Sequence, residues 1–103
     1  MKHTQLKSAL FKTGTVVMTR SVADWMETLP VTIRQYLPAV LLAAHTRGVW
    51  DSLTPNDAAA NRAALKSGEE ERIMSVYSIL DQKIWIITEW DRSLTTILFP
   101  SDY

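Results

Sequence analysis

The residues of this chain that are best suited to catalysis or metal binding are few. It contains two histidines, His3 and His45, and no cysteine. Cysteine-based zinc sites, iron–sulfur clusters and thiol catalysis are therefore excluded, and no HExxH motif is present. His3 lies in the part of the chain that we expect to be frayed, so any histidine chemistry depends on His45. A single histidine near a helix end usually bonds to a carbonyl or to water. We expect no metal site and no cofactor.

Two carboxylates, Glu89 and Asp91, cluster at the end of a predicted strand, next to Arg92. A hydrolytic acid–base pair would also need a cleft and a raised pKa, which the sequence does not show. A strand-end ion pair with Arg72 or Arg92 explains the cluster without any chemistry. Because no GxSxG elbow, GxxxxGK[ST] loop or GxGxxG loop occurs either, we expect that the protein is not an enzyme.

Four tryptophans in 103 residues are the feature that most favours a binding function. Core packing explains most of them. Trp85 and Trp90, however, fall on opposite faces of one predicted strand, so one of the two is expected to be an exposed anchor at a protein interface. The predicted partner-binding set consists of Trp50, Trp85, Glu89, Trp90, Asp91 and Arg92.

Charge is unevenly distributed along the chain. There are 11 basic and 11 acidic side chains, yet the first twenty residues hold four basic residues and no acid. We expect residues 1–12 to form a frayed basic arm on a mildly acidic body. The alternative to protein binding is that this arm contacts nucleic acid phosphates, a weak footprint because no aromatic residues are interleaved with the charges. The residues that would do so are Lys2, Lys7, Lys12 and Arg20.

Local signals predict three short helices. Ser21 is a good N-cap for a helix that ends at Pro30, and residues 31–37 predict only a loop or a single helical turn. Pro38 is expected at the first position of the next helix, which stops at Gly48. The expected helices are 21–29, 39–47 and 55–66.

Strands are predicted where β-branched and aromatic residues gather. One short strand is expected at 15–19, and three longer ones at 72–80, 83–90 and 94–99. Short polar connections predict that the last three pair as an antiparallel meander. The fold class is therefore α+β, with three short helices on a mainly antiparallel sheet. Both faces of the middle strand are apolar, so the second face needs a cover from the N-terminal segment, a second copy or a partner protein.

The length of 103 residues predicts one α+β domain over residues 13–103. No apolar stretch approaches the roughly 20 residues that span a bilayer, and no signal-peptide pattern begins the chain. We therefore expect a cytoplasmic protein that is not associated with a membrane.

The most specific sequence pattern is the segment WIITEWDRSLTTILFP, which runs from Trp85 to Pro100 and follows an H-x-x-G pattern at His45. The chain resembles the small "plasmid-related proteins" of plasmids and mobile elements, some of which carry the label "type I restriction endonuclease subunit M". The resemblance covers about residues 14–103, and this segment is its specific part. That family usually has an acid where this chain has Val49. The methyltransferase sense of the label is not supported, because the chain lacks a glycine-rich cofactor loop.

The resemblance implies a mobile-element context and no established activity. We therefore expect a non-catalytic protein-binding accessory protein of a mobile genetic element, and inhibition of a host defence complex of the restriction or CRISPR type is the specific form of this hypothesis. The partner would be a protein or a second copy of the chain, which would make a homodimer. A small nucleic-acid-binding accessory factor that uses the basic arm is the alternative.

Overall fold

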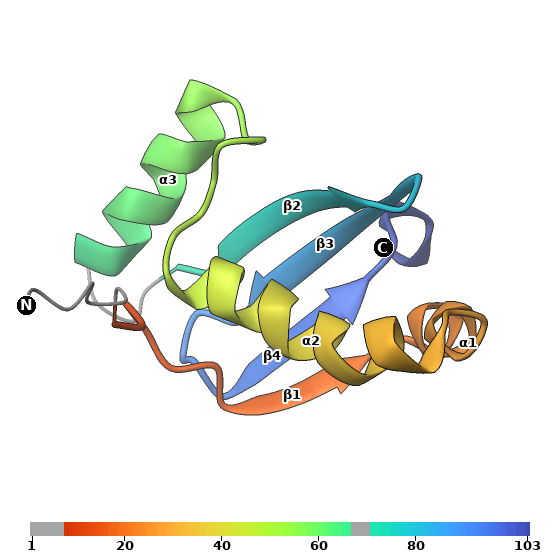
Figure 1. Cartoon of the computed structure of the whole chain (residues 1–103). Helices are drawn as coiled ribbons and strands as arrows, with labels where there is room; N and C mark the ends of the chain where they lie inside the picture. Colours follow the sequence, from red (N-terminus) through yellow and green to blue (C-terminus); the bar gives the residue numbers. More distant parts are fainter. Residues whose placement is uncertain (1–7, 67–70) are drawn as a thin grey trace, which may run out of the picture.

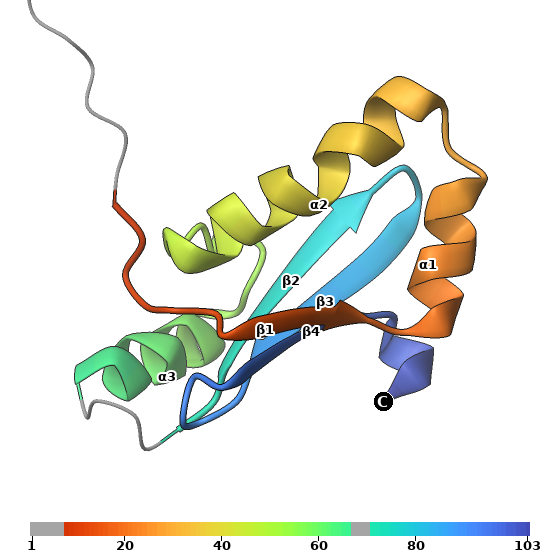
Figure 2. The ribbon, with the colours of Figure 1, turned by 90° about the horizontal axis from the view of Figure 1, so that it is seen from below.

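The fold is α+β, with helices packed on a mainly antiparallel sheet. The computed structural model describes residues 8–66 and 71–103, and these form three α-helices, a four-stranded sheet and a C-terminal 3-10 turn, η1 (Pro100–Asp102). Figures 1 and 2 show α2 lying across one face of the sheet, with α1 at one end of it and α3 beside β2. No helix in the described ranges is both long enough and apolar enough to cross a membrane.

The sheet has the strand order β1-β4-β3-β2. Its last three strands pair antiparallel in sequence order, which confirms the predicted meander. The turn between β2 and β3 is Leu80-Asp81, one residue earlier than the predicted Asp81-Gln82 turn, because both turn residues adopt positive φ as a two-residue hairpin loop requires. The strand bounds are β1 (Thr15–Met18), β2 (Ile73–Ile79), β3 (Gln82–Thr88) and β4 (Leu94–Leu98).

The strand β1 joins the sheet as an edge strand parallel to β4. Gly14 makes this possible: its φ is +63°, and a Cβ atom there would lie 2.3 Å from the carbonyl oxygen of Ser93. A non-glycine residue would be both strained and in collision with the β3–β4 turn. The N-terminal segment therefore extends the sheet and does not cover its second face.

The first helix, α1 (Arg20–Glu27), begins earlier than predicted. Its N-cap is Thr19, whose hydroxyl accepts from the backbone N–H of Val22. Ser21, the predicted cap, instead donates to the Asp102 carboxylate at 2.7 Å. A tertiary bond to the C-terminal turn thus takes the side chain that the local signal assigned to capping.

The prediction for residues 31–38 is wrong, because α2 (Val31–Thr46) is one continuous helix with Pro38 inside it. An internal proline costs a helix about 3 kcal/mol or more through a lost hydrogen bond and a steric clash. Leu37, Leu41 and His45 follow at four-residue spacing and are all buried, so the face that the helix packs on the sheet offsets that cost. The predicted end of α2 at Gly48, with φ +73°, is confirmed.

The third helix, α3 (Pro55–Lys66), has the predicted bounds. The Thr54 hydroxyl accepts from the backbone N–H of Asp57 at 3.2 Å, which is the N-cap bond expected from the sequence. The helix buries Ala58, Asn61 and Ala64 against the N-terminal end of β2.

Both faces of the sheet are covered to different extents. The face under α1 and α2 holds the main core, in which Val22, Leu41, Ile86 and Ile97 pack together.

On the second face of the sheet, η1 brings the ring of Tyr103 edge-on to Trp85, with 5.6 Å between the ring centroids. The Arg72 guanidinium donates to the Tyr103 hydroxyl at 2.7 Å. Ile87 and Leu98 are buried on this face. The C-terminus therefore supplies part of the cover that the sequence left open. Tyr103 covers Trp85 there, with the Arg72 guanidinium lying over the Tyr103 ring.

The packed domain extends further towards the N-terminus than residue 13. Leu10 donates its backbone N–H to the carbonyl of Thr46 at 2.8 Å. Phe11 packs on the cluster around Trp50, and its ring meets the ring of His45 edge-on at 5.0 Å. Leu10 and Phe11, both within the predicted arm of residues 1–12, therefore contact the rest of the protein.

Phe11 is half-buried where it packs on the cluster around Trp50. We expect Phe11→Ala to lower the free energy of unfolding by about 2 kcal/mol, because it removes a half-buried aromatic side chain. Leu10→Ala is the matched control, since Leu10 is 53% exposed and the substitution leaves its backbone bond in place, and it should cost less than about 1 kcal/mol. Urea denaturation measures both values. Equal costs would contradict a packing role for Phe11.

Candidate functional site

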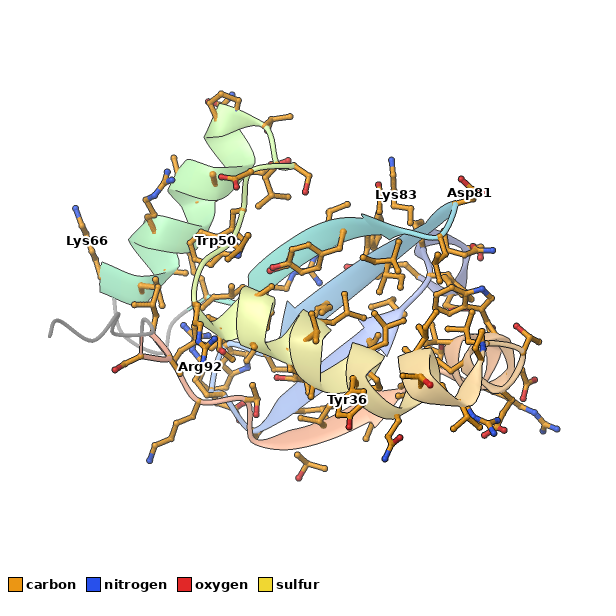
Figure 3. All side chains as sticks on the ribbon, in the orientation of Figure 1. Tyr36, Trp50, Lys66, Asp81, Lys83 and Arg92 are labelled. Carbon is orange, nitrogen blue, oxygen red and sulfur yellow. The ribbon has the colours of Figure 1, made fainter. Side chains whose placement is uncertain are left out.

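The residues of the predicted partner-binding set do not form one surface. Trp50 is 5% exposed and lies in the core cluster with Ala58, Ala64 and Ile73 (Figure 3). Trp85 is half-buried against Tyr103 on the second face of the sheet. The other four members lie together in the β3–β4 connection. They are Glu89, Trp90, Asp91 and Arg92.

Arg92 anchors this turn from inside the protein (Figure 3). It is 8% exposed, has a φ of +60°, and donates from Nη1 to the backbone carbonyls of Glu71, Glu89 and Trp90 at 2.6–3.3 Å. Arg92 contacts Glu89 through the Glu89 backbone carbonyl, and Arg72, the other predicted ion-pair partner, donates to the Tyr103 hydroxyl. Burial removes Arg92, like Trp50, from the residues that a partner can reach.

Asp91 and Trp90 are the exposed members of the turn. The Asp91 carboxylate accepts from the backbone N–H and the hydroxyl of Ser93 at 3.1 and 2.6 Å, and these bonds lower the pKa of Asp91. Trp90 is 59% exposed and lies beyond the end of β3, so it belongs to neither face of that strand. Of the two tryptophans proposed as an exposed anchor, Trp90 is therefore the more exposed.

Two of the four basic residues of the alternative function, Lys12 and Arg20, flank β1. Lys12 is exposed before β1, and Arg20 is exposed after it, at the start of α1. Arg20 also lies 3.9 Å from the Asp24 carboxylate in an exposed pair. Lys2 and Lys7 lie outside the described residues.

A buried polar network that the sequence did not predict is centred on His45, which is 0% exposed. Its Nδ1 lies 2.5 Å from the Ser75 hydroxyl, and its Nε2 lies 2.8 Å from the Thr88 hydroxyl. The Trp50 indole N–H donates to Ser75 at 2.9 Å. At the other end, Thr88 and Thr95 share a bond of 2.7 Å, and Thr95 donates to the backbone carbonyl of Thr13 at 2.8 Å.

Counting donors and acceptors fixes the direction of every bond in this chain. Thr95 donates to a carbonyl, so its oxygen accepts from Thr88, and Thr88 in turn accepts from the Nε2–H of His45. Neutral His45 then accepts at Nδ1 from Ser75, which accepts from Trp50. The protons therefore all point one way, from the indole of Trp50 to the carbonyl of Thr13, and this assigns the Nε2–H tautomer.

Burial makes the network a structural unit. Loss of hydration lowers the pKa of His45 from 6.5 to about 3, so the imidazole is neutral at physiological pH. Ser75 and Thr88 are also 0% exposed, so a substrate cannot reach the Ser75–His45 pair. No buried side-chain nitrogen or oxygen in the described part of the chain lacks a hydrogen-bond partner. The only sequence signal for this network was its three hydroxyl residues at inward-facing strand positions.

Three exposed apolar side chains form a stripe on α2. Ile33, Tyr36 and Val40 follow at three- and four-residue spacing and are 37%, 60% and 60% exposed. Figure 3 shows Tyr36 on the side of α2 that faces β1, where Val16 is also exposed. We name these four residues, Val16, Ile33, Tyr36 and Val40, together with the open edge of β1, the β1–α2 surface. The sequence missed it because residues 31–37 gave no clear helix.

No family model, curated protein or solved structure matches this chain. The geometry is therefore the basis for any functional assignment. Within the described ranges no three histidine or acidic side chains gather as metal ligands would. The exposed features are an apolar surface, a tryptophan-bearing turn and a groove.

The groove, of about 310 Å³, lies between α3 and β2. Its polar lining includes Asp57 and Arg72, while Leu53, Met74 and Val76 supply apolar surface. The Asn61 amide, which also lines it, is occupied by the backbone of Met74, to which it bonds at 2.7 and 3.1 Å. The groove therefore lies at the edge of β2, where the Asn61 side chain already bonds to the backbone of the strand.

Proposed function

We propose that this protein is a non-catalytic protein-binding module that binds its partner through the β1–α2 surface. The observation that carries the proposal is the exposure of Tyr36 and Val40, each 60%, on a helix face beside an edge strand. Aromatic side chains in apolar patches are common anchors at protein interfaces. Partner binding would remove this apolar area from water.

The absence of a catalytic role is part of the same proposal. His45 and Ser75, the pair best suited to chemistry, are buried and engaged in the network. The exposed carboxylate of Asp91 stabilises a turn through Ser93. These side chains have structural explanations, which supports binding over catalysis.

The cellular role we propose is that of a cytoplasmic accessory protein of a mobile genetic element, which inhibits a host defence complex. This part rests on the resemblance of the segment 85–100 to plasmid-borne proteins. Expression in a host with an active restriction or CRISPR system should raise the establishment of a targeted plasmid at least about tenfold. In a host that lacks the system it should change nothing. An equal effect in both hosts would contradict the inhibitor role.

A charged residue introduced into the β1–α2 surface tests whether the partner binds there. We expect Tyr36→Glu to reduce capture of the partner from the native host at least about tenfold, because a carboxylate cannot be buried without compensation. Gln35→Glu is the matched control, since Gln35 is exposed on α2 away from the stripe. Quantitative mass spectrometry of co-purified proteins measures the loss. Unchanged capture by Tyr36→Glu would remove the β1–α2 surface from the proposal.

The same preparation separates this function from nucleic acid binding. Lys12 and Arg20 are exposed on either side of β1, which is the observation that favours the alternative. Phosphate contacts release counterions, so DNA affinity falls steeply as salt rises, whereas burial of an apolar surface does not. Retention of the partner at high salt supports protein binding, and loss of a DNA complex at the same salt identifies the alternative.

A further inference from the structure

The two edges of the sheet differ in how their backbone groups are used. At the β2 edge the Asn61 side chain bonds to the N–H and the carbonyl of Met74, and the Ser52 hydroxyl donates to the carbonyl of Val76 at 2.8 Å. These side chains occupy backbone groups that another strand would need. Proteins commonly cover an edge strand with a helix or loop in this way, which prevents pairing with other chains.

The β1 edge keeps such backbone groups open. The N–H of Thr15 donates to the carbonyl of Ser93 at 3.0 Å, so Thr15 faces β4. Because the direction of the backbone groups alternates along a strand, the N–H and carbonyl groups of Val16 and Met18 point away from β4. No residue in the described part of the chain bonds to them. The edge therefore presents two donors and two acceptors.

This pattern of donors and acceptors is complementary to itself. Two β1 strands that pair antiparallel about Val17 place Val16 of one copy opposite Met18 of the other. Residues opposite each other at such positions exchange both of their backbone hydrogen bonds. A two-fold axis produces the same pair twice, so all four open groups of each copy are satisfied. The edge of β1 thus fits a second copy of itself without any change in its backbone.

Both faces of β1 also carry exposed apolar side chains. Met18 packs on the core under α2, so Val16, which is 39% exposed, lies on that face, and Val17, which is 40% exposed, lies on the other. In the antiparallel pair Val17 lies directly opposite Val17 of the second copy, at a position where side chains are in close contact. A second copy therefore removes apolar side chains from water on both faces of the strand.

The α2 stripe distinguishes a second copy from an isolated strand of another protein. Figure 3 shows Tyr36 of this stripe on the side of α2 that faces β1. A two-fold axis at β1 places the α2 helix of the second copy on the same face of the joined sheet, with its own stripe directed towards the axis. An isolated strand would bring no second helix to the stripe. The helix and the edge strand thus favour the same occupant.

The charges at the two ends of β1 do not oppose this pairing. Lys12 and Asp91 are exposed at one end, and Arg20, Asp24 and Asp102 are exposed at the other, where Arg20 lies 3.9 Å from the Asp24 carboxylate. Antiparallel pairing brings the Lys12 end of one copy to the end of the other that holds two carboxylates. Charges of opposite sign are therefore available at each end of the interface.

We propose that the partner at the β1–α2 surface is a second copy of this chain, and that antiparallel β1 strands join the two four-stranded sheets into one continuous sheet. This inference rests on the proposed protein-binding function and names the partner. The interface is isologous, because the same residues contribute from both copies.

The oligomeric state of the full-length protein tests the inference without any variant. We expect light scattering to give about 23 kDa, twice the chain mass of 11.7 kDa, at a protein concentration of about 100 μM. The amides of Val16 and Met18 should exchange with solvent more slowly as the concentration is raised and the dimer forms. A mass of 11.7 kDa at the higher concentration, or a dimer that leaves the exchange of both amides unchanged, would overturn the inference.

Charges introduced at Val17 test the two-fold axis itself. Val17→Lys and Val17→Glu each place like charges opposite each other and should weaken association at least about tenfold, whereas an equimolar mixture of the two should form a heterodimer. Ser78→Lys and Ser78→Glu are the matched controls and should remain dimers, since Ser78 is exposed on β2 at the opposite edge. Undiminished association of Val17→Lys, or a mixture of folded variants that stays monomeric, would contradict pairing through β1.

The results also separate this inference from the function on which it rests. If the full-length protein is monomeric but Tyr36→Glu still reduces capture of a different protein, the dimer inference fails and the protein-binding function stands. If the Val17 variants behave as expected but capture does not depend on Tyr36, the proposed function itself fails.

Discussion

Lowering the pH from about 7 to about 5 is expected to remove about 2 kcal/mol from the free energy of unfolding, through His45 alone. In the unfolded chain this histidine binds a proton below its ordinary pKa of 6.5, whereas burial lowers the pKa in the folded protein to about 3. The unfolded state therefore holds more protons throughout this range, and stability falls as the solution becomes more acidic. Urea denaturation at a series of pH values measures the slope.

His45→Gln is the control for this prediction. The amide can donate to Thr88 and accept from Ser75, as the neutral imidazole does, but it does not titrate. The variant should lose markedly less stability than the wild type between about pH 7 and about pH 5. The lowered pKa values of Asp91 and Asp102 act at more acidic pH, because these carboxylates contribute stability that is lost only as pH falls through their folded-state pKa.

A second measurement does not depend on any variant. The ring protons of His45 in the native protein should show no titration between about pH 7 and about pH 5 in nuclear magnetic resonance spectra. A native-state pKa near 6.5 for this residue would contradict the neutral, directed network.

The elements that could be predicted from the sequence are those whose signals are local. The β-branched segments gave all four strands to within two residues, since their preference for extended backbone is reinforced by burial in the sheet. The helix α3 begins as expected because Thr54 and Pro55 satisfy its first turn without help from the rest of the protein.

The elements that could not be predicted depend on contacts between distant segments. Proline is common at the first position of a helix, which is why Pro38 was expected to begin one. The burial of Leu37 and Leu41 on the sheet makes a continuous helix favourable instead. Ser21 lost its capping role to Asp102, 81 residues away. Neither of these contacts can be predicted from the residues close to Pro38 or Ser21 in the sequence.

The candidate site was predicted only in part for the same reason. Residue type does not reveal which tryptophan is buried, and Trp50 turned out to belong to the core while Trp90 is exposed. Arg92 is buried because three backbone carbonyls are arranged around its guanidinium, an arrangement that only the folded turn creates. The open edge of β1 became visible only when the strand order was known.

The buried network and the open edge are connected. The directed chain of hydrogen bonds starts at Trp50 and ends at the carbonyl of Thr13, one residue before the glycine that introduces β1. A short parallel edge strand has few contacts of its own. We infer that the network supplies part of what fixes β1 on β4, so damage in the core should loosen the proposed binding edge as well as the fold.

Ser75→Ala tests this connection and is expected to have the largest effect of any single substitution proposed for the network. It leaves the indole N–H of Trp50 and the Nδ1 of His45 buried without partners. Each unsatisfied buried group costs about 1–3 kcal/mol, so the total should be about 3 kcal/mol. The change in volume is small, which excludes a cavity as the main cause.

Ser78→Ala is the matched control, because Ser78 lies on the same strand with its side chain on the opposite face, where it is exposed. It should change the free energy of unfolding by no more than about 0.5 kcal/mol. Ser75→Ala should also speed the hydrogen exchange of the Trp50 indole N–H and of the Val17 amide, which faces β4, whereas Ser78→Ala should change neither. Equal stability of the two variants would show that the network contributes nothing to the fold. A destabilised Ser75→Ala protein with unchanged exchange at Val17 would show that the network stabilises the core without fixing β1.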